Sequence, residues 1–569
     1  MDHGLKKHLM KTKILALFLA VSALGLTSCE DFLEEKNKSG LTQDPYYNTE
    51  LGVTSAVNAC YSGTRLWYGK EAPFGMTETG TDLFLRGGDN KANQLSDYSV
   101  DLNGAQTNLK DYWSHLYKAL NVCNTAAALL PSPVLSDALN KQYEGEVKFL
   151  RALYLSLIVE TWGDVVLTTT PSAGVITTAK RSSTEDFYKT IFADLDVAIA
   201  NLDARKSTNG RITQDVAKAF KARMALTRAS QTNDAALYAQ AATLAKELIS
   251  SGRYTLFSDY ASLWDMKNSE GGTNSEVVYY VNYTNDDTMN GDYNAGAGRG
   301  NNGHLYYIMV YDKQPGMERS VAYGRPYQRY MPSTRLLDLY NETVDQRYHG
   351  SFQTVWYANM ANLKDGTVNG YPEMSLGDTS MVFLKTPATS SQIARAAGRY
   401  KIFDRPTMYR PDGSPLLRSQ FIQLKKFMDP TRLTANQEWS SRDAFVIRLA
   451  ELYLIAAEAL MQTNPGEAAE YMNTLRLKRA IPGKEEQMRI SAADLNIDFI
   501  LEERARELAG EQIRWYDLKR TGKLVEYVQK YNPDAKDNIR EHHQVRPIPQ
   551  VQLDAITNKG EFTQNQGYN

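Results

Sequence analysis

Aromatic and amide side chains gather in one stretch of the chain, in a combination that suits binding of sugars. Between Tyr279 and Tyr330 there are ten tyrosines in 52 residues, where the 35 tyrosines of the 569-residue chain predict about three. Aromatic rings stack on the apolar C–H faces of sugars, while amide and guanidinium groups bind their hydroxyls. The stretch therefore predicts a saccharide-binding surface, with the following candidate contacts: Tyr283, Tyr293, Arg299, Asn301, His304, Tyr306, Tyr307 and Arg325.

A second stretch repeats this mixture of aromatic and polar side chains. It adds the candidates Trp67, Phe84, Arg86, Asn90 and Tyr98, and Trp356 with its neighbour Tyr357 forms a third. Two other interpretations of these residues stay open. Tyrosine clusters also pack irregular loops, and the same surface could face a partner protein instead of a ligand.

Charged residues follow one another at helical spacing from Glu502 onward. Glu502 with Arg506 supports a helix, whereas Glu503 with Glu507, and Glu507 with Glu511, place like charges one turn apart. We expect such carboxylates to pair with cations elsewhere in the fold, for which the candidates are Arg448, Arg476 and Arg151. A carboxylate pair could instead serve as the acid and base of a glycoside hydrolase. Neighbouring carboxylates on one charged helix favour the structural role.

Other residues with chemical potential lack the required spacing. His304, His349 and the pair His542-His543 do not have metal-ligand spacing. The chain also contains no Gly-x-Ser-x-Gly motif and no phosphate-binding loop. The sequence predicts a binding protein that is not an enzyme, with no catalytic residue, no metal and no cofactor.

The overall charge and the cysteine count exclude further classes. Lys and Arg total 64 and Asp and Glu total 66, a net charge of −2, so no basic surplus indicates nucleic-acid binding. Apart from Cys29, the chain has only Cys60 and Cys123, which do not make a disulfide framework. Both fall in helical patterns, where small buried thiols are common.

The N-terminus has the pattern of an export signal. Lys11 and Lys13 precede the 12-residue apolar run from Ile14 to Gly25, which is shorter than the about 20 residues of a membrane-spanning helix. Leu26-Thr27-Ser28-Cys29 resembles a bacterial lipobox, in which the Cys carries the lipid; an ordinary signal peptide with an incidental Cys is the alternative. We predict a signal peptide at 1–28, started by Met1 or Met10, and a lipidated Cys29 with a polar tether over 29–44.

Helical periodicity dominates the first half of the mature chain. Apolar residues recur at helical spacing over 49–61, 109–123, 147–158, 187–202, 216–226 and 237–248. Ser182 with Glu185 has the spacing of a capping box before one helix, and Asp234 is placed to open another. Paired amphipathic helices with short connections are typical of a tetratricopeptide-like array.

The region 268–440 is different, because it contains Gly-rich stretches and few apolar periods. We expect short strands at Glu276–Tyr283 and Met381–Lys385, and loops elsewhere. Helices are predicted again at Phe445–Leu460, from Asn464-Pro465 to Arg479, and over roughly Leu495–Arg520. The expected fold is mainly α: one domain over 45–569, with a helical-repeat frame at 45–267 and 441–569 and a large loop-rich insertion carrying the ligand side.

Several separated sequence blocks resemble the SusD/RagB-like outer-membrane lipoproteins of Bacteroidetes. The most specific block is Ile500 to Ala509, followed by Glu511, Arg514-Trp515, Asp517-Leu518 and Arg520-Thr521-Gly522. Others are Arg448 to Leu454 with Ala456 to Ala459, then Asn473, Arg476 and Arg479-Ala480, Phe149 to Ala152 with Trp162 to Asp164, Pro547-Ile548-Pro549, and Gln564 to Tyr568. Gln566 stands where the family usually has Pro.

The resemblance implies a function and a location. Such proteins lie on the outer face of the outer membrane, pair with a SusC-like TonB-dependent transporter, and hold oligosaccharides or other nutrients for import. Glu30-Asp31 resembles the acidic export signal of these lipoproteins, and family members build the ligand site from the two loop regions named above. We therefore expect a surface glycan-binding lipoprotein; a surface glycoside hydrolase and a peptide- or protein-binding helical scaffold are the alternatives.

Overall fold

The computed structural model describes residues 43–89, 93–290, 300–360 and 374–568. The chain divides into two compact units, Met1–Val53 and Thr54–Asn569. The helix α3 (Gln43–Tyr47) belongs to the first unit, and α4 (Glu50–Ser62) begins there and continues into the second. The predicted signal peptide, Cys29 and almost all of the tether lie outside the described residues.

Long amphipathic helices build the N-terminal part of the second unit. They are α8 (Thr107–Ala128), α9 (Asp137–Trp162), α10 (Thr184–Asn201), α11 (Gln214–Thr232) and α12 (Ala235–Ser250). Each packs against the next, and their apolar faces are buried as the periodicity predicts. Cys60 and Cys123 are buried free thiols on α4 and α8.

The caps of these helices follow the predicted chemistry, with one shift. The carboxylate of Asp234 accepts hydrogen bonds from the amides of Ala236 and Leu237 and so opens α12. At α10 the capping box is Ser183 with Asp186, one residue beyond the predicted Ser182 with Glu185. The prediction was wrong by one residue because Asp186, like Glu, can reach back to the cap amide.

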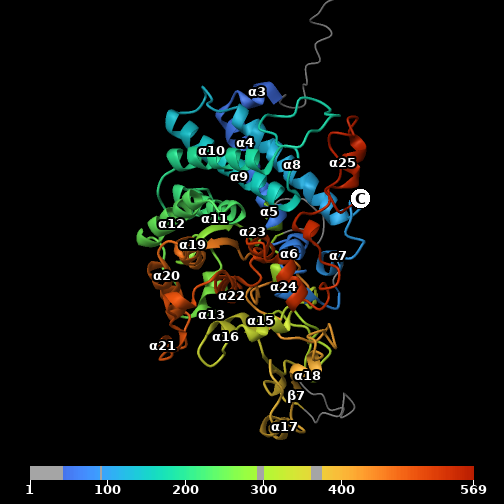
Figure 1. Cartoon of the computed structure of the whole chain (residues 1–569). Helices are drawn as coiled ribbons and strands as arrows, with labels where there is room; N and C mark the ends of the chain where they lie inside the picture. Colours follow the sequence, from blue (N-terminus) through green and yellow to red (C-terminus); the bar gives the residue numbers. More distant parts are fainter. Residues whose placement is uncertain (1–42, 90–92, 291–299, 361–373, 569) are drawn as a thin grey trace, which may run out of the picture. The chain divides into compact units, whose positions relative to one another are not determined.

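The C-terminal helices pack onto this frame from a distant part of the sequence. They are α19 (Leu449–Leu460), α20 (Pro465–Lys478), α21 (Glu485–Met488), α22 (Ile497–Leu508), α23 (Arg514–Arg520), α24 (Leu524–Tyr531) and α25 (Gln550–Ala555). Figure 1 shows α19 and α20 beside α11 and α12, and contacts join α12 to α19 and α11 to α23. The frame is therefore formed by both ends of the mature chain.

Two predicted C-terminal helices differ in the structure. Phe445–Arg448 lies in the strand β9 (Ala444–Arg448), which pairs antiparallel with β2 (Val277–Val281). Val446 and Ile447 are β-branched and favour this conformation. The predicted helix over Leu495–Arg520 breaks between α22 and α23, where Gly510 and Gln512 have positive φ angles of 82° and 61°. Buried Glu78 accepts the amides of Gly510 and Ile513 at this break.

The loop-rich region contains small sheets. The pairs are β1 (Phe84–Arg86) with β3 (Tyr330–Pro332) and β4 (Phe352–Gln353) with β8 (Gln423–Leu424), both antiparallel. A third sheet has the order β5 (Val355–Tyr357), β6 (Thr379–Phe383), β7 (Lys401–Phe403), with β6 and β7 parallel. The predicted strands at 276–283 and 381–385 thus correspond to β2 and β6.

Short helices complete the described chain. They are α5 (Thr64–Trp67), α6 (Glu71–Thr77), α7 (Asn93–Asp97), α13 (Tyr260–Leu263), α14 (Gly303–Tyr306), α15 (Thr334–Asp338), α16 (Arg347–Ser351), α17 (Ser390–Ala396) and α18 (Arg405–Met408). Single 3₁₀ turns lie at Met266–Asn268, Asp287–Asn290, Ala492–Asp494 and Glu541–Gln544. No helix within the described ranges has the length and apolarity needed to cross a membrane.

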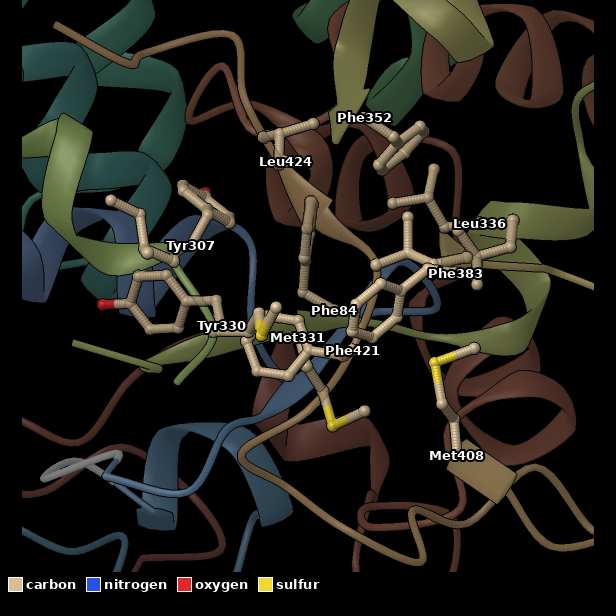
Figure 2. Packing of buried hydrophobic residues seen from close by; sticks show 14 of the residues in the cluster. Phe84, Tyr307, Tyr330, Met331, Leu336, Phe352, Phe383, Met408, Phe421 and Leu424 are labelled. Carbon is tan, nitrogen blue, oxygen red and sulfur yellow. The ribbon is translucent and has the colours of Figure 1, made fainter. Parts of the chain in front are cut away.

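The loops pack around a core of their own. Figure 2 shows Phe84, Tyr307, Tyr330, Met331 and Phe421 gathered in it, from segments far apart in the sequence. These side chains come from β1, β3 and the segments after α14 and α18. The insertion thus shares one hydrophobic interior with the N-terminal segment around β1 and with Ala505 and Ala509 of the C-terminal part.

Candidate functional site

Most of the aromatic candidates lie in the interior. Trp67, Phe84 and Tyr98 from the second stretch are at most 2% exposed, and the Tyr98 hydroxyl donates to the carbonyl oxygen of Gly80. Tyr283, Tyr306 and Tyr307 from the tyrosine-rich stretch are at most 3% exposed. Because these six rings are buried, they do not present a surface for direct contact with a ligand. They pack the irregular loops against one another instead, as the alternative interpretation predicts.

Tyr307 illustrates this packing. Its ring lies 5.1 Å from that of Phe84 and 5.4 Å from that of Tyr330, as Figure 2 shows for all three. Edge-to-face contacts at these distances are typical of aromatic cores. Tyrosine suits this region because its ring tolerates irregular surroundings while its hydroxyl can reach a loop carbonyl, as Tyr283 does with Tyr68 at 2.6 Å.

The polar candidates His304 and Asn301 are also buried. Asn301 spans two loops, since its side-chain amide donates to the carbonyl of Arg442 and its Oδ1 accepts from Gly303. Burial, together with the nearby Arg432 guanidinium, lowers the pKa of His304 to about 3, against the opposing effect of Asp429. His304 is thus a neutral interior side chain, which removes it from the candidate ligand contacts.

Three candidates, Asn90, Tyr293 and Arg299, lie outside the described residues. Of the remaining ones, Arg86 and Arg325 have partly exposed side chains. Arg86 ends β1, and its carbonyl oxygen accepts from Arg418. Arg325 belongs to a group of polar and aromatic side chains that are joined by hydrogen bonds at the surface.

We call this surface the loop face and define it by seven side chains that are exposed or half-buried: Arg319, Tyr323, Arg325, Tyr327, Tyr357, Asn436 and Glu438. The Arg325 guanidinium donates to the Glu438 carboxylate at 2.6 Å, and the Tyr327 hydroxyl donates to the same oxygen. Arg319 donates to the side-chain oxygen of Asn436 at 3.1 Å. The Tyr323 hydroxyl also donates to the backbone carbonyl oxygen of Tyr357 at 3.2 Å, so hydrogen bonds join three segments that are remote in sequence, residues 319–327, 357 and 436–438.

Beneath the loop face lies the third aromatic candidate. Trp356 is fully buried, stacks on Tyr311 at 4.8 Å with an interplanar angle of 20°, and contacts Tyr323 at 4.8 Å. Its neighbour Tyr357 points the other way along β5 and is 50% exposed. The prediction of Trp356 as a contact is therefore corrected to a supporting role, since strand alternation exposes Tyr357 instead.

The loop face offers the groups that bind a polyhydroxylated ring. Tyr357, Tyr323 and Tyr327 present aromatic surface, while Asn436, Glu438 and the two arginines present donors and acceptors. The ion pair between Arg325 and Glu438 fixes both groups before any ligand arrives, which reduces the entropy lost on binding. The tyrosine count signalled Tyr323 and Tyr327, but nothing in the local pattern signalled Asn436 or Glu438.

The carboxylates of the C-terminal block are engaged in ion pairs, as predicted. Glu507 contacts Arg448 at 3.0 Å and Arg479 at 2.9 Å, and Glu503 pairs with Arg476. Arg151, the third predicted partner, pairs with Asp194 at 2.6 Å instead. Burial alone would raise the pKa of Glu507, but the surrounding guanidiniums hold it well below its usual range. Glu503 and Glu507 are thus structural ion-pair partners of these arginines.

Neither acid–base chemistry nor metal chemistry is indicated by the geometry. Glu503 and Glu507 of this block are buried and paired with arginines, and Glu511 and Asp517 line only a small cavity of about 60 Å³ beside Arg504 and Arg520. Among the described residues, no group of three or more His, Cys, Asp or Glu side chains is arranged to hold a metal ion. The loop face remains the best candidate site.

Comparison with known proteins decides the family. A model described as the SusD family matches residues 417–568, and one described as "Starch-binding associating with outer membrane" matches residues 31–226. The chain belongs to the SusD/RagB family. SusD-like protein P25 of Formosa agariphila is 25% identical over 587 aligned residues, covering 98% of this chain and 99% of that protein. The family prediction made from the sequence blocks is confirmed.

Solved SusD-like structures share the fold. A laminarin-binding SusD-like protein has a TM-score of 0.67 at 22% identity, covering 91% of this chain and 100% of that one. Surface glycan-binding protein A from Bacteroides fluxus has a TM-score of 0.66 at 19% identity, with the same coverage. The mainly helical, SusD-like fold predicted from the sequence is confirmed.

Proposed function

We propose that this SusD/RagB-family protein is a cell-surface lipoprotein that binds an oligosaccharide at the loop face. The observation that carries the proposal is the array of tyrosines, arginines, Asn436 and Glu438 from three segments, held by hydrogen bonds and partly exposed. Support comes from solved proteins of the same fold, a laminarin-binding SusD-like protein and a surface glycan-binding protein A.

The proposal extends to attachment and partner. A lipid on Cys29 would anchor the protein to the outer membrane, in line with the family model whose description associates it with that membrane. A SusC-like TonB-dependent transporter would receive the captured ligand. Both parts derive from the lipobox-like segment and the family resemblance.

The two alternatives are less well supported. A glycoside hydrolase requires two opposed carboxylates about 5–9.5 Å apart beside the sugar. On the loop face, Glu438 is neutralised by Arg325 and bonded by Tyr327. A peptide-binding scaffold would use the helical frame, but the partly exposed aromatic array lies on the insertion.

The test is binding by calorimetry of residues 30–569 to laminarin, starch and xyloglucan oligosaccharides and to a peptide library. We expect saturable binding to a glycan without new reducing ends. Tyr357→Ala with Arg325→Ala should weaken this binding about tenfold or more, because one stacking surface and one charged donor are lost.

Tyr238→Ala is the matched control, since it removes a half-buried tyrosine from α12, away from the loop face. An unchanged affinity in the loop-face variant would refute the placement of the site. Release of reducing ends would establish a hydrolase, and binding of peptides alone would establish the scaffold. Thermal melts of both variants exclude unfolding as the cause of any loss.

A further inference from the structure

A second surface carries an excess of positive charge that the loop face does not use. Residues 384–411, which we call the basic arm, contain Lys385, Arg395, Arg399, Lys401, Arg405 and Arg410, and Asp404 is the single acidic residue among them. This is a net charge of +5 in a chain whose total is −2. The arm comprises α17, β7 and α18, which Figure 1 shows close together.

A comparable excess elsewhere in the chain is neutralised by other segments. Residues 205–228 contain seven cationic residues and one acidic residue. Five of those cations pair with carboxylates from other elements: Arg211 with Glu146, Lys218 with Glu247, Lys221 with Asp196, Arg223 with Glu451 and Arg228 with Glu185. In that segment the positive charge serves helix packing.

The cations of the basic arm are treated differently. Lys385 pairs with Glu342 and Arg405 pairs with Asp338. Arg395, Arg399 and Arg410 are exposed and form no ion pair with any carboxylate in the described part of the chain; the Arg410 guanidinium donates to the carbonyl oxygen of Pro415 at 2.7 Å. Because exposed charges are well solvated, packing alone does not require three guanidiniums here.

A hollow of the structure adjoins Arg410, one of these three residues. Its volume is about 360 Å³, and it is lined by Thr334, Pro387, Arg405, Pro406, Tyr409, Arg410, Pro411, Gly413 and Leu416. Ligand sites typically begin at about 300 Å³. The prolines and Tyr409 give it apolar walls, and Arg410 places an exposed guanidinium on its lining, whereas Arg405 is paired there with Asp338. The combination suits a ring with an anionic substituent.

We propose that the basic arm binds sulfated or carboxylated units of a polysaccharide, with one such unit seated in the hollow and others contacting Arg395 and Arg399. Guanidinium forks match sulfate and carboxylate oxygens in pairs, and apolar walls accept the C–H face of a sugar. The inference rests on the proposed glycan-binding function and adds a second contact surface together with a substrate class, anionic glycans.

The test compares polymers of one backbone, dextran and dextran sulfate, with polygalacturonate as the carboxylated probe. The wild-type protein should bind the anionic polymers but not dextran at the arm, and binding should weaken as NaCl rises from about 50 to 300 mM. Arg395→Gln, Arg399→Gln and Arg410→Gln together should reduce affinity for the anionic polymers about tenfold or more.

A triple variant of the helical frame, Lys118→Gln, Lys141→Gln and Lys189→Gln, provides the matched control. It removes the same charge from exposed positions on α8, α9 and α10, and we expect its affinity to stay within about twofold of wild type. Equal losses in both triples, or no binding of either anionic polymer, would overturn the inference.

Two further readouts keep the result unambiguous. If the triple variant of the arm does not fold, the double variant Arg395→Gln with Arg399→Gln replaces it in the binding test. Both residues are exposed near the end of α17, so their substitution should leave the fold intact. Loss of the arm should leave binding of a neutral glycan at the loop face unchanged. If the protein binds a neutral glycan but neither anionic polymer, only the proposed role of the basic arm is refuted. If it binds neither kind of glycan, the proposed function is refuted as well.

Discussion

Glu78 joins the N-terminal loops to the family-specific C-terminal block. Its side chain is fully buried, and its two oxygens accept the amides of Gly510 and Ile513 at 3.1 and 3.0 Å. Burial raises the pKa of Glu78 to about 7, although these amides and the Arg514 guanidinium act in the opposite direction. Folding therefore disfavours ionisation of Glu78 relative to the unfolded chain.

This pKa predicts a pH dependence with a definite sign. The folded pKa lies above the unfolded one, so stabilisation by the protonated group is complete below about pH 4.5 and is lost as the pH rises to about 7. Glu78→Gln, which cannot ionise, should therefore gain about 3 kcal/mol of unfolding free energy relative to wild type between pH 4.5 and 8. Any hydrogen bond lost in Glu78→Gln adds a constant, independent of pH, to the difference in unfolding free energy between the variant and wild type.

Denaturant melts at several pH values measure this difference. Glu318→Gln is the control, since it removes a carboxylate from an exposed position. A difference between wild type and Glu78→Gln that stays flat from pH 4.5 to 8, or drifts no more than that of the control, would show that Glu78 ionises freely in the folded state.

At the scale of elements, caps decide where the helices of the frame begin. The Ser183 hydroxyl accepts from the amide of Asp186, and the Asp186 carboxylate accepts from the amide of Ser183. Two amides at the start of α10 are thereby satisfied. The break between α22 and α23 has a similar cause. There the amides of Gly510 and Ile513 donate to the Glu78 carboxylate instead of to helical carbonyl oxygens.

The cap gives a prediction with a matched control one residue away. Ser183→Ala should lower the unfolding free energy by about 1 kcal/mol, because the amide of Asp186 loses its acceptor. Ser182→Ala should change it by less than about 0.5 kcal/mol, since Ser182 contributes its backbone amide, bonded to Val165, at this position. Thermal unfolding of both variants measures these changes. A larger loss of unfolding free energy in Ser182→Ala than in Ser183→Ala would show that the assignment of the cap to Ser183 is wrong.

At the scale of the whole molecule, the proposed lipid anchor on Cys29 would determine where the protein acts. Stable attachment to a membrane takes more than one acyl chain, a condition that the usual lipoprotein load meets. Polar residues from Glu30 to Asp44 would then separate the lipid from the folded domain. This arrangement would let the domain move over a transporter while its lipid stays in the membrane.

Cys29→Ala tests the anchor. We expect the variant to lose outer-membrane attachment while the purified domain keeps its melting temperature and its glycan affinity, because the change removes only the lipid. Membrane fractionation with immunoblotting measures the first property, and calorimetry measures the second. Continued co-fractionation with the outer membrane would show that the lipobox interpretation is wrong or that a partner alone retains the protein.

The sequence by itself determined the family, the helical frame and the ionic role of the C-terminal block. These features depend on local periodicity and on charges at fixed helical offsets, which one stretch of chain displays without its neighbours. Asp234 and Asn464 show this, because each cap was predictable from a few adjacent residues and the structure contains both.

Only the tertiary structure decided which aromatic residues lie at the surface. Tyr307 and Tyr357 look alike in the sequence, but one lies in the core and the other is 50% exposed. In irregular loops no period separates an inner face from an outer face, so exposure depends on packing between distant segments. The meeting of Arg325 with Glu438, and the absence of a carboxylate partner for Arg395 and Arg399 among the described residues, likewise follow from which segments the fold brings together.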